Sequence, residues 1–153
     1  MKIVITGATG MVGKGVLYEC LDNPDIKDVL IVNRTPVGMD HPKMEEILIP
    51  DFFDLEGITK DLAGFDACFF CLGVSSFRMS EENYTRITYD LTLNFAQTFL
   101  KQNRDSVFCY ISGAGTDSSE KGRIMWARVK GKTENDLLKL PFKASYMFRP
   151  GFI

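Results

Sequence analysis

Residues 1–21 read MKIVITGATGMVGKGVLYECL, and the middle of this stretch decides the fold. The apolar run over residues 2–6 is typical of a buried strand, and it breaks at a segment with three glycines, each three positions from the next. The apolar spacing that follows predicts an amphipathic helix over residues 12–21. A strand, a glycine-rich loop and a helix in this order indicate a loop whose backbone meets a ligand.

Each glycine has a predicted role in that loop. Gly7 permits a tight turn, Gly10 lets the backbone approach a pyrophosphate, and Gly13 lets the helix pack closely on the sheet. The GxxGxxG spacing is a weak signal alone, but its place between a strand and a helix strengthens it. Lys14 is not followed by the Ser or Thr of a phosphate-binding Walker A loop. We therefore predict dinucleotide binding here, and the alternative is a merely structural turn.

Short apolar runs alternate with helical patterns along the whole chain. Helices are predicted over residues 12–21, from an N-cap at Ser80 to residue 99, and over residues 125–140. Continuous hydrophobicity in the strands is typical of a parallel sheet covered on both faces. We predict one Rossmann domain over residues 1–153, an α/β fold with a doubly wound parallel sheet in the order 3-2-1-4-5-6. The predicted strands cover residues 2–6, 29–33, 46–50, 67–72, 107–112 and 144–148.

Composition narrows the range of partners. The chain has 153 residues, a net charge of −2, 45% hydrophobic and 25% charged residues, which match an average globular domain. This balance gives no electrostatic reason to expect nucleic acid or an anionic membrane, so we predict a small-molecule ligand. The apolar run at the N-terminus is too short for a signal peptide or a membrane span, which predicts a cytoplasmic protein. His41 is the single histidine, which argues against zinc sites and histidine-based triads.

The four cysteines are Cys20, Cys68, Cys71 and Cys109. The CFFC stretch has the spacing of a redox motif, but redox pairs of this kind open a helix. Here strand alternation sends Cys68 and Cys71 to opposite faces of the sheet. We therefore predict reduced, buried thiols rather than a redox pair.

The second predicted strand ends in VNRT at residues 32–35. Sheets that bind NAD usually offer an Asp or Glu here to the ribose hydroxyls, whereas this chain offers Asn and Arg. Because a guanidinium suits a phosphate, Arg34 favours NADP over NAD, with NAD as the alternative cofactor. The other interpretation of Arg34 is stacking on adenine or exposure to water.

Five segments, together with the arginine after the second strand, resemble a known family. They are TGATGMVG, CLG after the fourth strand, YISGAG on the fifth, WARVKGKTE on the next helix, and FRPG at the end. In this order they resemble the atypical short-chain dehydrogenase/reductases, closest to the NmrA-like and Tat-interacting oxidoreductase-like branch. The resemblance covers essentially the whole chain. It implies an NAD(P)-binding Rossmann protein with an oxidoreductase or epimerase-like activity.

The resemblance also implies which residues surround the cofactor. One of these residues, Asp51, has the alternative interpretation of an ordinary loop residue without a role in binding. The implied cofactor residues are Gly7, Thr9, Gly10, Met11, Val12 and Gly13 around the pyrophosphate, Arg34 at the adenosine end, Asp51 and Phe52 at adenine, Leu72, Gly73 and Lys130 at ribose, and Pro150 near the nicotinamide.

Reductases of this superfamily use a serine, a tyrosine and a lysine. Ser112 and Lys130 match two of these catalytic residues, but the position of the tyrosine is occupied by Trp126. An indole N–H cannot exchange a proton at working pH, so acid–base catalysis from that position is lost. We expect Tyr110 and Tyr146 to be core residues rather than replacements.

Two functions therefore remain open from the sequence, one catalytic and one not. The first is an NADP-dependent oxidoreductase or epimerase-like enzyme whose proton comes from elsewhere. The second is a non-catalytic nucleotide-binding protein with a regulatory or redox-sensing role, acting through a protein partner. A structural domain with an empty crevice is a third, weaker interpretation, and a homodimer is left open. Family members continue past the RPG segment, so we expect residues 1–153 to lack the C-terminal part that covers the substrate.

Overall fold

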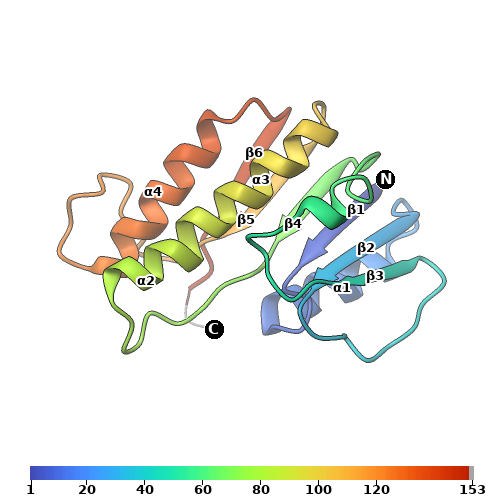
Figure 1. Cartoon of the computed structure of the whole chain (residues 1–153), viewed down its shortest axis with the longest axis horizontal. Coiled ribbons are helices and arrows are strands. Elements are labelled where there is room, and N and C mark those ends of the chain that lie inside the picture. Colours follow the sequence, from blue (N-terminus) through green and yellow to red (C-terminus); the bar gives the residue numbers. More distant parts are fainter. Residues whose placement is uncertain (152–153) are drawn as a thin grey trace.

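The computed structural model describes residues 1–151, which form a six-stranded sheet with helices on both faces (Figure 1). The strands lie in the order β3-β2-β1-β4-β5-β6, and every neighbouring pair is parallel. This confirms the predicted doubly wound Rossmann sheet. The strands are β1 (Lys2–Thr6), β2 (Asp28–Asn33), β3 (Met44–Leu48), β4 (Ala67–Phe70), β5 (Val107–Ile111) and β6 (Ala144–Phe148).

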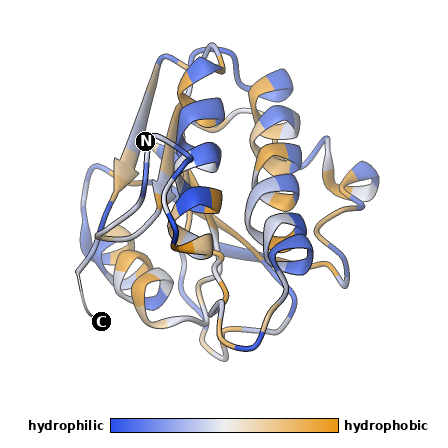
Figure 2. Cartoon of the chain, turned by 90° about the vertical axis from the view of Figure 1, so that its left-hand side faces the viewer, coloured by the Kyte–Doolittle hydropathy of each residue, from blue (hydrophilic) through white to orange (hydrophobic). Residues whose placement is uncertain are grey.

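Helical elements separate most of the strands, but β3 follows β2 with no helix between them, so the predicted alternation of strand and helix fails at that connection. Ser80 is the N-cap predicted from the sequence, and its side chain accepts a hydrogen bond from the Asn83 amide at 3.2 Å. Each longer helix carries both apolar and polar residues, as Figure 2 shows, because one side packs on the sheet. The helical elements are α1 (Met11–Asp22), the 3₁₀ turn η1 (Glu56–Ile58), α2 (Glu81–Thr85), the π-helical turn η2 (Arg86–Asp90), α3 (Leu91–Gln102) and α4 (Met125–Lys139).

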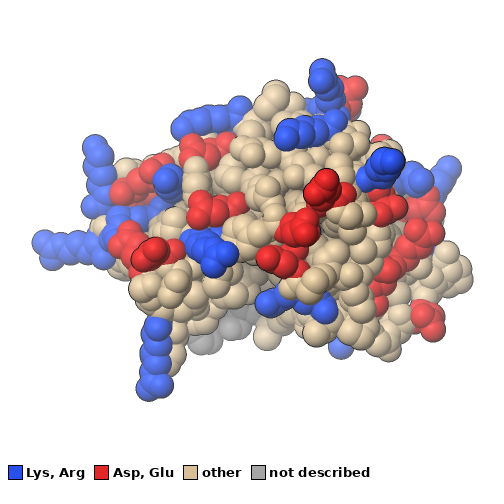
Figure 3. Space-filling view, in the orientation of Figure 1, with Lys and Arg blue, Asp and Glu red and all other residues tan. Residues whose placement is uncertain are grey.

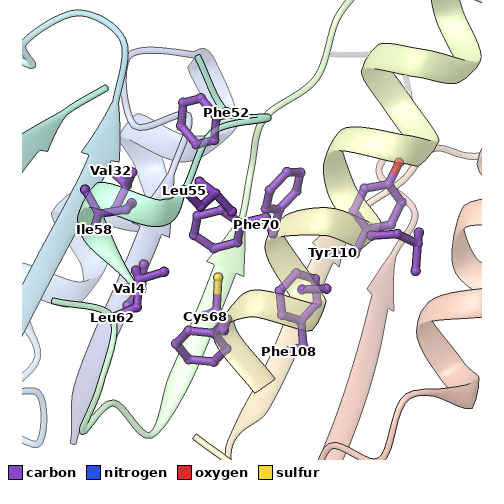
Figure 4. Close-up of a cluster of buried hydrophobic side chains, with 14 of the residues drawn as sticks. Val4, Val32, Phe52, Leu55, Ile58, Leu62, Cys68, Phe70, Phe108 and Tyr110 are labelled. Atoms are coloured by element: carbon purple, nitrogen blue, oxygen red, sulfur yellow. The ribbon is translucent and has the colours of Figure 1, made fainter. Parts of the chain in front are cut away.

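The two faces of the sheet build two separate cores. Alternate side chains of the strands point to one face, where they meet η1, α3 and α4 (Figure 4). Phe70 lies near the centre of this core, with ring centroids 5.5 Å from Phe95 and 6.0 Å from Phe108. The intervening side chains of β1 and β2 point to the other face and pack against α1. The larger core fixes the strand ends that carry the site.

One part of the α1 face is less covered than expected. Tyr146 and Phe148 on β6 are 54% and 49% exposed. The expectation that Tyr146 is a core residue is therefore wrong, because β6 is the edge strand and α1 packs beside β1 and β2. Tyr110, in contrast, is buried as predicted.

Several strand boundaries differ from the prediction. The sequence predicts the third strand over residues 46–50, but the structure has it at Met44–Leu48. This strand is the opposite edge of the sheet, where polar side chains are common. Glu46 is one of them, and its side chain accepts a hydrogen bond from the Val37 amide. The apolar residues therefore do not show where the strand begins and ends. The fourth strand ends at Phe70, two residues earlier than predicted, and the fifth ends at Ile111, one residue earlier than predicted.

The remaining expectations about the fold concern thiols, membrane helices and charge. All four cysteines are free; three are buried and Cys71 is half-buried. Within residues 1–151, no helix has the length and apolar character needed to cross a bilayer. Basic and acidic side chains are interspersed over the face shown in Figure 3.

Candidate functional site

The glycine loop adopts the tight turn that the sequence predicts. Gly7 has a φ of +70°, and a Cβ there would lie 2.8 Å from backbone atoms of Cys71 and Leu72. The loop after β1 is thus pressed against the segment that follows β4. The Gly10 amide closes the turn by donating to the Gly7 carbonyl at 3.0 Å. Any other residue at position 7 would be strained and would also collide with backbone.

Gly10 is the N-cap of α1 and faces outward. It has φ −79° and ψ 165°, makes no side-chain cap, and a Cβ there would meet only the Gly7 carbonyl oxygen at 3.4 Å. The first amides of α1 have no intrahelical acceptors, and the first turn contains no acidic side chain. Met11, in that turn, is 73% exposed. This end of the helix is therefore suited to an anion such as a diphosphate.

Gly13 is required by packing, but its neighbour is not the one predicted. A Cβ at Gly13 would lie 2.1 Å from the Gly7 carbonyl oxygen and 3.0 Å from the Cα of Ala8. The helix therefore packs closely on the glycine loop itself rather than on the sheet. The loop and the first turn of α1 form one unit whose shape depends on this contact.

A cavity of about 200 Å³ lies beside this unit, at the carboxyl ends of the strands. Five of the residues expected at adenine and ribose line it, but Lys130, also expected at ribose, does not. The other residues that line the cavity were not predicted from the sequence, although Ile87 and Leu91 are one helical turn apart, the spacing of a shared helix face. The cavity is lined by the predicted Arg34, Asp51, Phe52, Leu72 and Gly73, and by Pro50, Phe53, Val74, Ile87 and Leu91.

The polar side chains that line this cavity differ in whether they are already bound to other protein groups. Arg34 is exposed, and its guanidinium is in no ion pair with the described residues. Asp51 uses one carboxylate oxygen to accept a hydrogen bond from the Phe53 amide at 2.8 Å. Phe52 is only 2% exposed, so it belongs mainly to the core and forms only a small part of the cavity lining. Arg34 is thus the group in this cavity best suited to a phosphate.

The two predicted catalytic residues lie at the end of β5 and on α4. Ser112 is buried, and its hydroxyl oxygen lies 2.9 Å from that of Thr116. The Lys130 ammonium donates to the Ser112 carbonyl at 2.9 Å. Burial lowers the pKa of Lys130, and the nearby Glu134 carboxylate opposes that shift. Both side chains are held by the segment that follows β5.

Trp126 lies on the same helix and packs against the same segment. Its indole is half-buried, and Cβ atoms added at Gly113 and Gly115 would lie 3.7 Å and 3.5 Å from it. Tyr110 does not take the place of the missing tyrosine, because it points into the large core, where burial raises its pKa. Trp126 and Lys130 therefore contact the same segment after β5, and the placement of Trp126 at the nicotinamide stays a prediction.

Two further motif residues have structural roles that the sequence did not reveal. Glu134 of the WARVKGKTE segment is 2% exposed and pairs through both carboxylate oxygens with Arg149 of the FRPG segment. A Cβ at Gly131 would lie within 1.8 Å of the Asp117 carbonyl oxygen. Pro150, expected near the nicotinamide, accepts a hydrogen bond from the Ala114 amide at 2.7 Å. These contacts fasten α4, β6 and the segment after β5 together.

Known proteins resemble this chain in sequence and in fold. The model of the NAD dependent epimerase/dehydratase family matches residues 3–123. Protein HTATIP2 of Rattus norvegicus is 26% identical over 154 residues, covering 99% of this chain and 62% of that protein. Protein FMP52, mitochondrial, of Candida albicans is 28% identical over 155 residues, covering 99% and 66%. The solved structure of MoeE5 in complex with UDP-glucose and NAD has a TM-score of 0.75 at 16% identity, covering 97% of this chain and 54% of that one.

Proposed function

Because the chain belongs to the NAD dependent epimerase/dehydratase family, we propose that it binds NAD(P)(H) as part of an oxidoreductase or epimerase-like enzyme. One observation carries the proposal. The glycine loop after β1, Arg34 after β2 and Leu72 after β4 lie at the same edge of one parallel sheet, where such folds bind dinucleotides. The diphosphate would lie at the start of α1 and the adenosine in the cavity of about 200 Å³.

Binding is tested by titrating the protein with NADPH and NADH and following the fluorescence of Trp126, the single tryptophan. The matched variant is Gly10→Val. Gly10 has a φ of −79° and a ψ of 165°, which valine can also adopt. A Cβ added there would lie no closer than 3.4 Å to any other atom, so the variant should fold. The branched side chain would stand where the diphosphate approaches. We expect a loss of affinity of at least about tenfold, or 1.4 kcal/mol. Equal affinity in a folded variant would contradict the proposed site.

The finer proposal is a preference for NADP(H) over NAD(H). Its support is Arg34, which is exposed, lines the cavity and is in no ion pair with the described residues. A charge-assisted bond to the 2′-phosphate contributes about 1.5 to 3 kcal/mol. Arg34→Ala should therefore remove most of the difference between the two cofactors, measured as the ratio of their dissociation constants. Equal affinities in the unmodified protein would refute this preference.

A second candidate function is a regulatory protein that binds the cofactor without turnover. Three observations favour it: an indole occupies the tyrosine position, Ser112 faces Thr116, and Lys130 donates to a backbone carbonyl. A cofactor oxidation assay with carbonyl substrates separates the two candidates. Steady turnover supports the enzyme, and binding without turnover supports the regulator.

The extent and location of the protein are also proposals. We propose that residues 1–153 are the dinucleotide-binding domain and that the part covering the substrate lies outside them. The chain spans 62% and 66% of the length of two of its relatives, which supports this division. The cytoplasmic location remains a prediction, since the Candida albicans relative is named as mitochondrial. Fractionation of cells that express the tagged protein would test it.

A further inference from the structure

Asn33, the last residue of β2, links that strand to the glycine loop. Its side-chain Oδ1 accepts a hydrogen bond from the Ala8 amide at 3.2 Å. Both residues are buried, with exposures of 2% and 1%. Because only an oxygen can accept from an N–H group, this bond also fixes which way the side-chain amide is turned. Sequence reasoning noted Asn33 only as a residue that is not acidic.

The bond lies under the part of the loop that approaches the ligand. Ala8 follows Gly7, whose carbonyl oxygen is the atom pressed against Gly13. A loop held at Ala8 from below and at Gly7 by the first turn of α1 has little freedom to change shape. The amides at the start of α1 are then presented in a fixed arrangement, so a diphosphate need not order them.

Another buried asparagine shows what a purely structural role looks like. Asn103 accepts hydrogen bonds from the Gly64 and Phe65 amides and donates to the Leu62 and Phe99 carbonyls. It joins α3 to the loop before β4, at the amino ends of the strands. Its polar atoms are fully used, whereas the Nδ2 of Asn33 meets no acceptor among the described residues. A buried, unpaired donor costs stability, so Asn33 is not explained by folding alone.

We propose that Asn33 is a positioning residue for the diphosphate, acting through its hydrogen bond to the Ala8 amide. This inference rests on the proposed binding of a dinucleotide at the glycine loop. It assigns Asn33 no contact with the ligand. Loss of the side-chain oxygen should therefore weaken ligands that contain a diphosphate and spare ligands that lack one.

The test compares Asn33→Leu, which removes the acceptor at similar size, with Asn33→Asp, which keeps it. We expect Asn33→Leu to weaken ADP by at least about tenfold and to change the affinity for adenosine by less than about twofold. Asn33→Asp should bind NADH within about threefold of the unmodified protein, because a carboxylate oxygen can still accept the hydrogen bond from the Ala8 amide. Amide hydrogen exchange at Ala8, measured without ligand, should accelerate in Asn33→Leu and stay slow in Asn33→Asp.

Asn103→Ala is the matched control, since it removes a buried asparagine at the amino ends of the strands, away from the glycine loop. It should lower the unfolding temperature and leave ADP affinity unchanged. If Asn33→Leu does not fold, Asn33→Ala gives the same comparison with a smaller side chain. A folded Asn33→Leu that binds ADP as well as the unmodified protein overturns the inference alone. Failure of the unmodified protein to bind any dinucleotide overturns the proposed function, and this inference with it.

Discussion

Replacing Gly13 by alanine tests whether the glycine loop and α1 act as one unit. The added Cβ would lie 2.1 Å from the Gly7 carbonyl oxygen, whereas real Cβ atoms essentially never approach closer than 3.0 Å. The atoms that it meets are all backbone, so no side chain can rotate away. Either the loop or the first turn of α1 must move by nearly an ångström. Gly15, two residues further along the same helix, is exposed, and a Cβ added there would have nothing within 4 Å.

Both substitutions therefore raise helix propensity, but only Gly13→Ala also creates a steric clash. Each exchanges glycine for the best helix former inside α1, which contributes about 1 kcal/mol of stability. Gly13→Ala adds overpacking, which typically costs about 1 to 3 kcal/mol. We expect Gly15→Ala to raise the unfolding temperature by about 2 to 4 °C. We expect Gly13→Ala to be less stable than Gly15→Ala by at least about 1 kcal/mol.

Cofactor affinity gives the sharper difference. Because the displaced loop would no longer present its amides to the diphosphate, Gly13→Ala should weaken NADPH by at least about tenfold. Gly15→Ala should leave the dissociation constant within about twofold. Thermal unfolding and fluorescence titration of both variants measure these quantities on the same samples. If Gly13→Ala matches Gly15→Ala in both assays, the close contact at Gly7 does not shape the site.

Two other predictions follow from the site and the core. Trp126→Tyr should restore a proton donor beside Lys130 and raise any carbonyl reduction by about 10² to 10⁴, measured as NADPH oxidation; no gain would mean that position 126 does not face the reacting carbonyl. Burial raises the pKa values of Cys20 and Cys109 to about 11 and of Cys71 to about 12, from 9.0. The thiols are therefore protonated in the folded protein, and their contribution to stability is complete below pH 9 and lost as pH rises toward 11 to 12. Iodoacetamide at pH 8 should label the folded protein at least about tenfold more slowly than the urea-unfolded protein, and equal rates would contradict the burial of these thiols.

Much of the fold was predictable because its signals are local. The run from Lys2 to Thr6, the glycine loop and the helix after it each follow from hydrophobic spacing and from the freedom of glycine. The strand order then followed from the alternation of strands and helices. The positive φ of Gly7 confirms the predicted tight turn, whereas its close approach to Cys71 and Leu72 could not be read from the local sequence.

The features that the sequence did not predict depend on how segments pack in three dimensions. Tyr146 looks like a core residue in its own strand, but its exposure depends on which helices pack beside that edge. The partner of Gly13 is the carbonyl of Gly7, a distance that no spacing rule contains. Asn33 gave no signal beyond its lack of charge, and its hydrogen bond with the Ala8 amide became visible only in the structure.

Most residues proposed for cofactor binding and those proposed for proton transfer follow different strands of this sheet. The glycine loop, Arg34 and the cavity lie after β1, β2 and β4, whereas Ser112, Trp126 and Lys130 gather around the segment after β5. That segment is fastened by its own contacts with α4 and by the pair formed between Glu134 and Arg149. Trp126 is part of neither the glycine loop nor the cavity, whereas Lys130 on the same helix is expected both to hold the ribose and to act in catalysis. The titration with NADPH and the turnover assay therefore ask separate questions of Gly10 and of Trp126, and the first can succeed where the second fails.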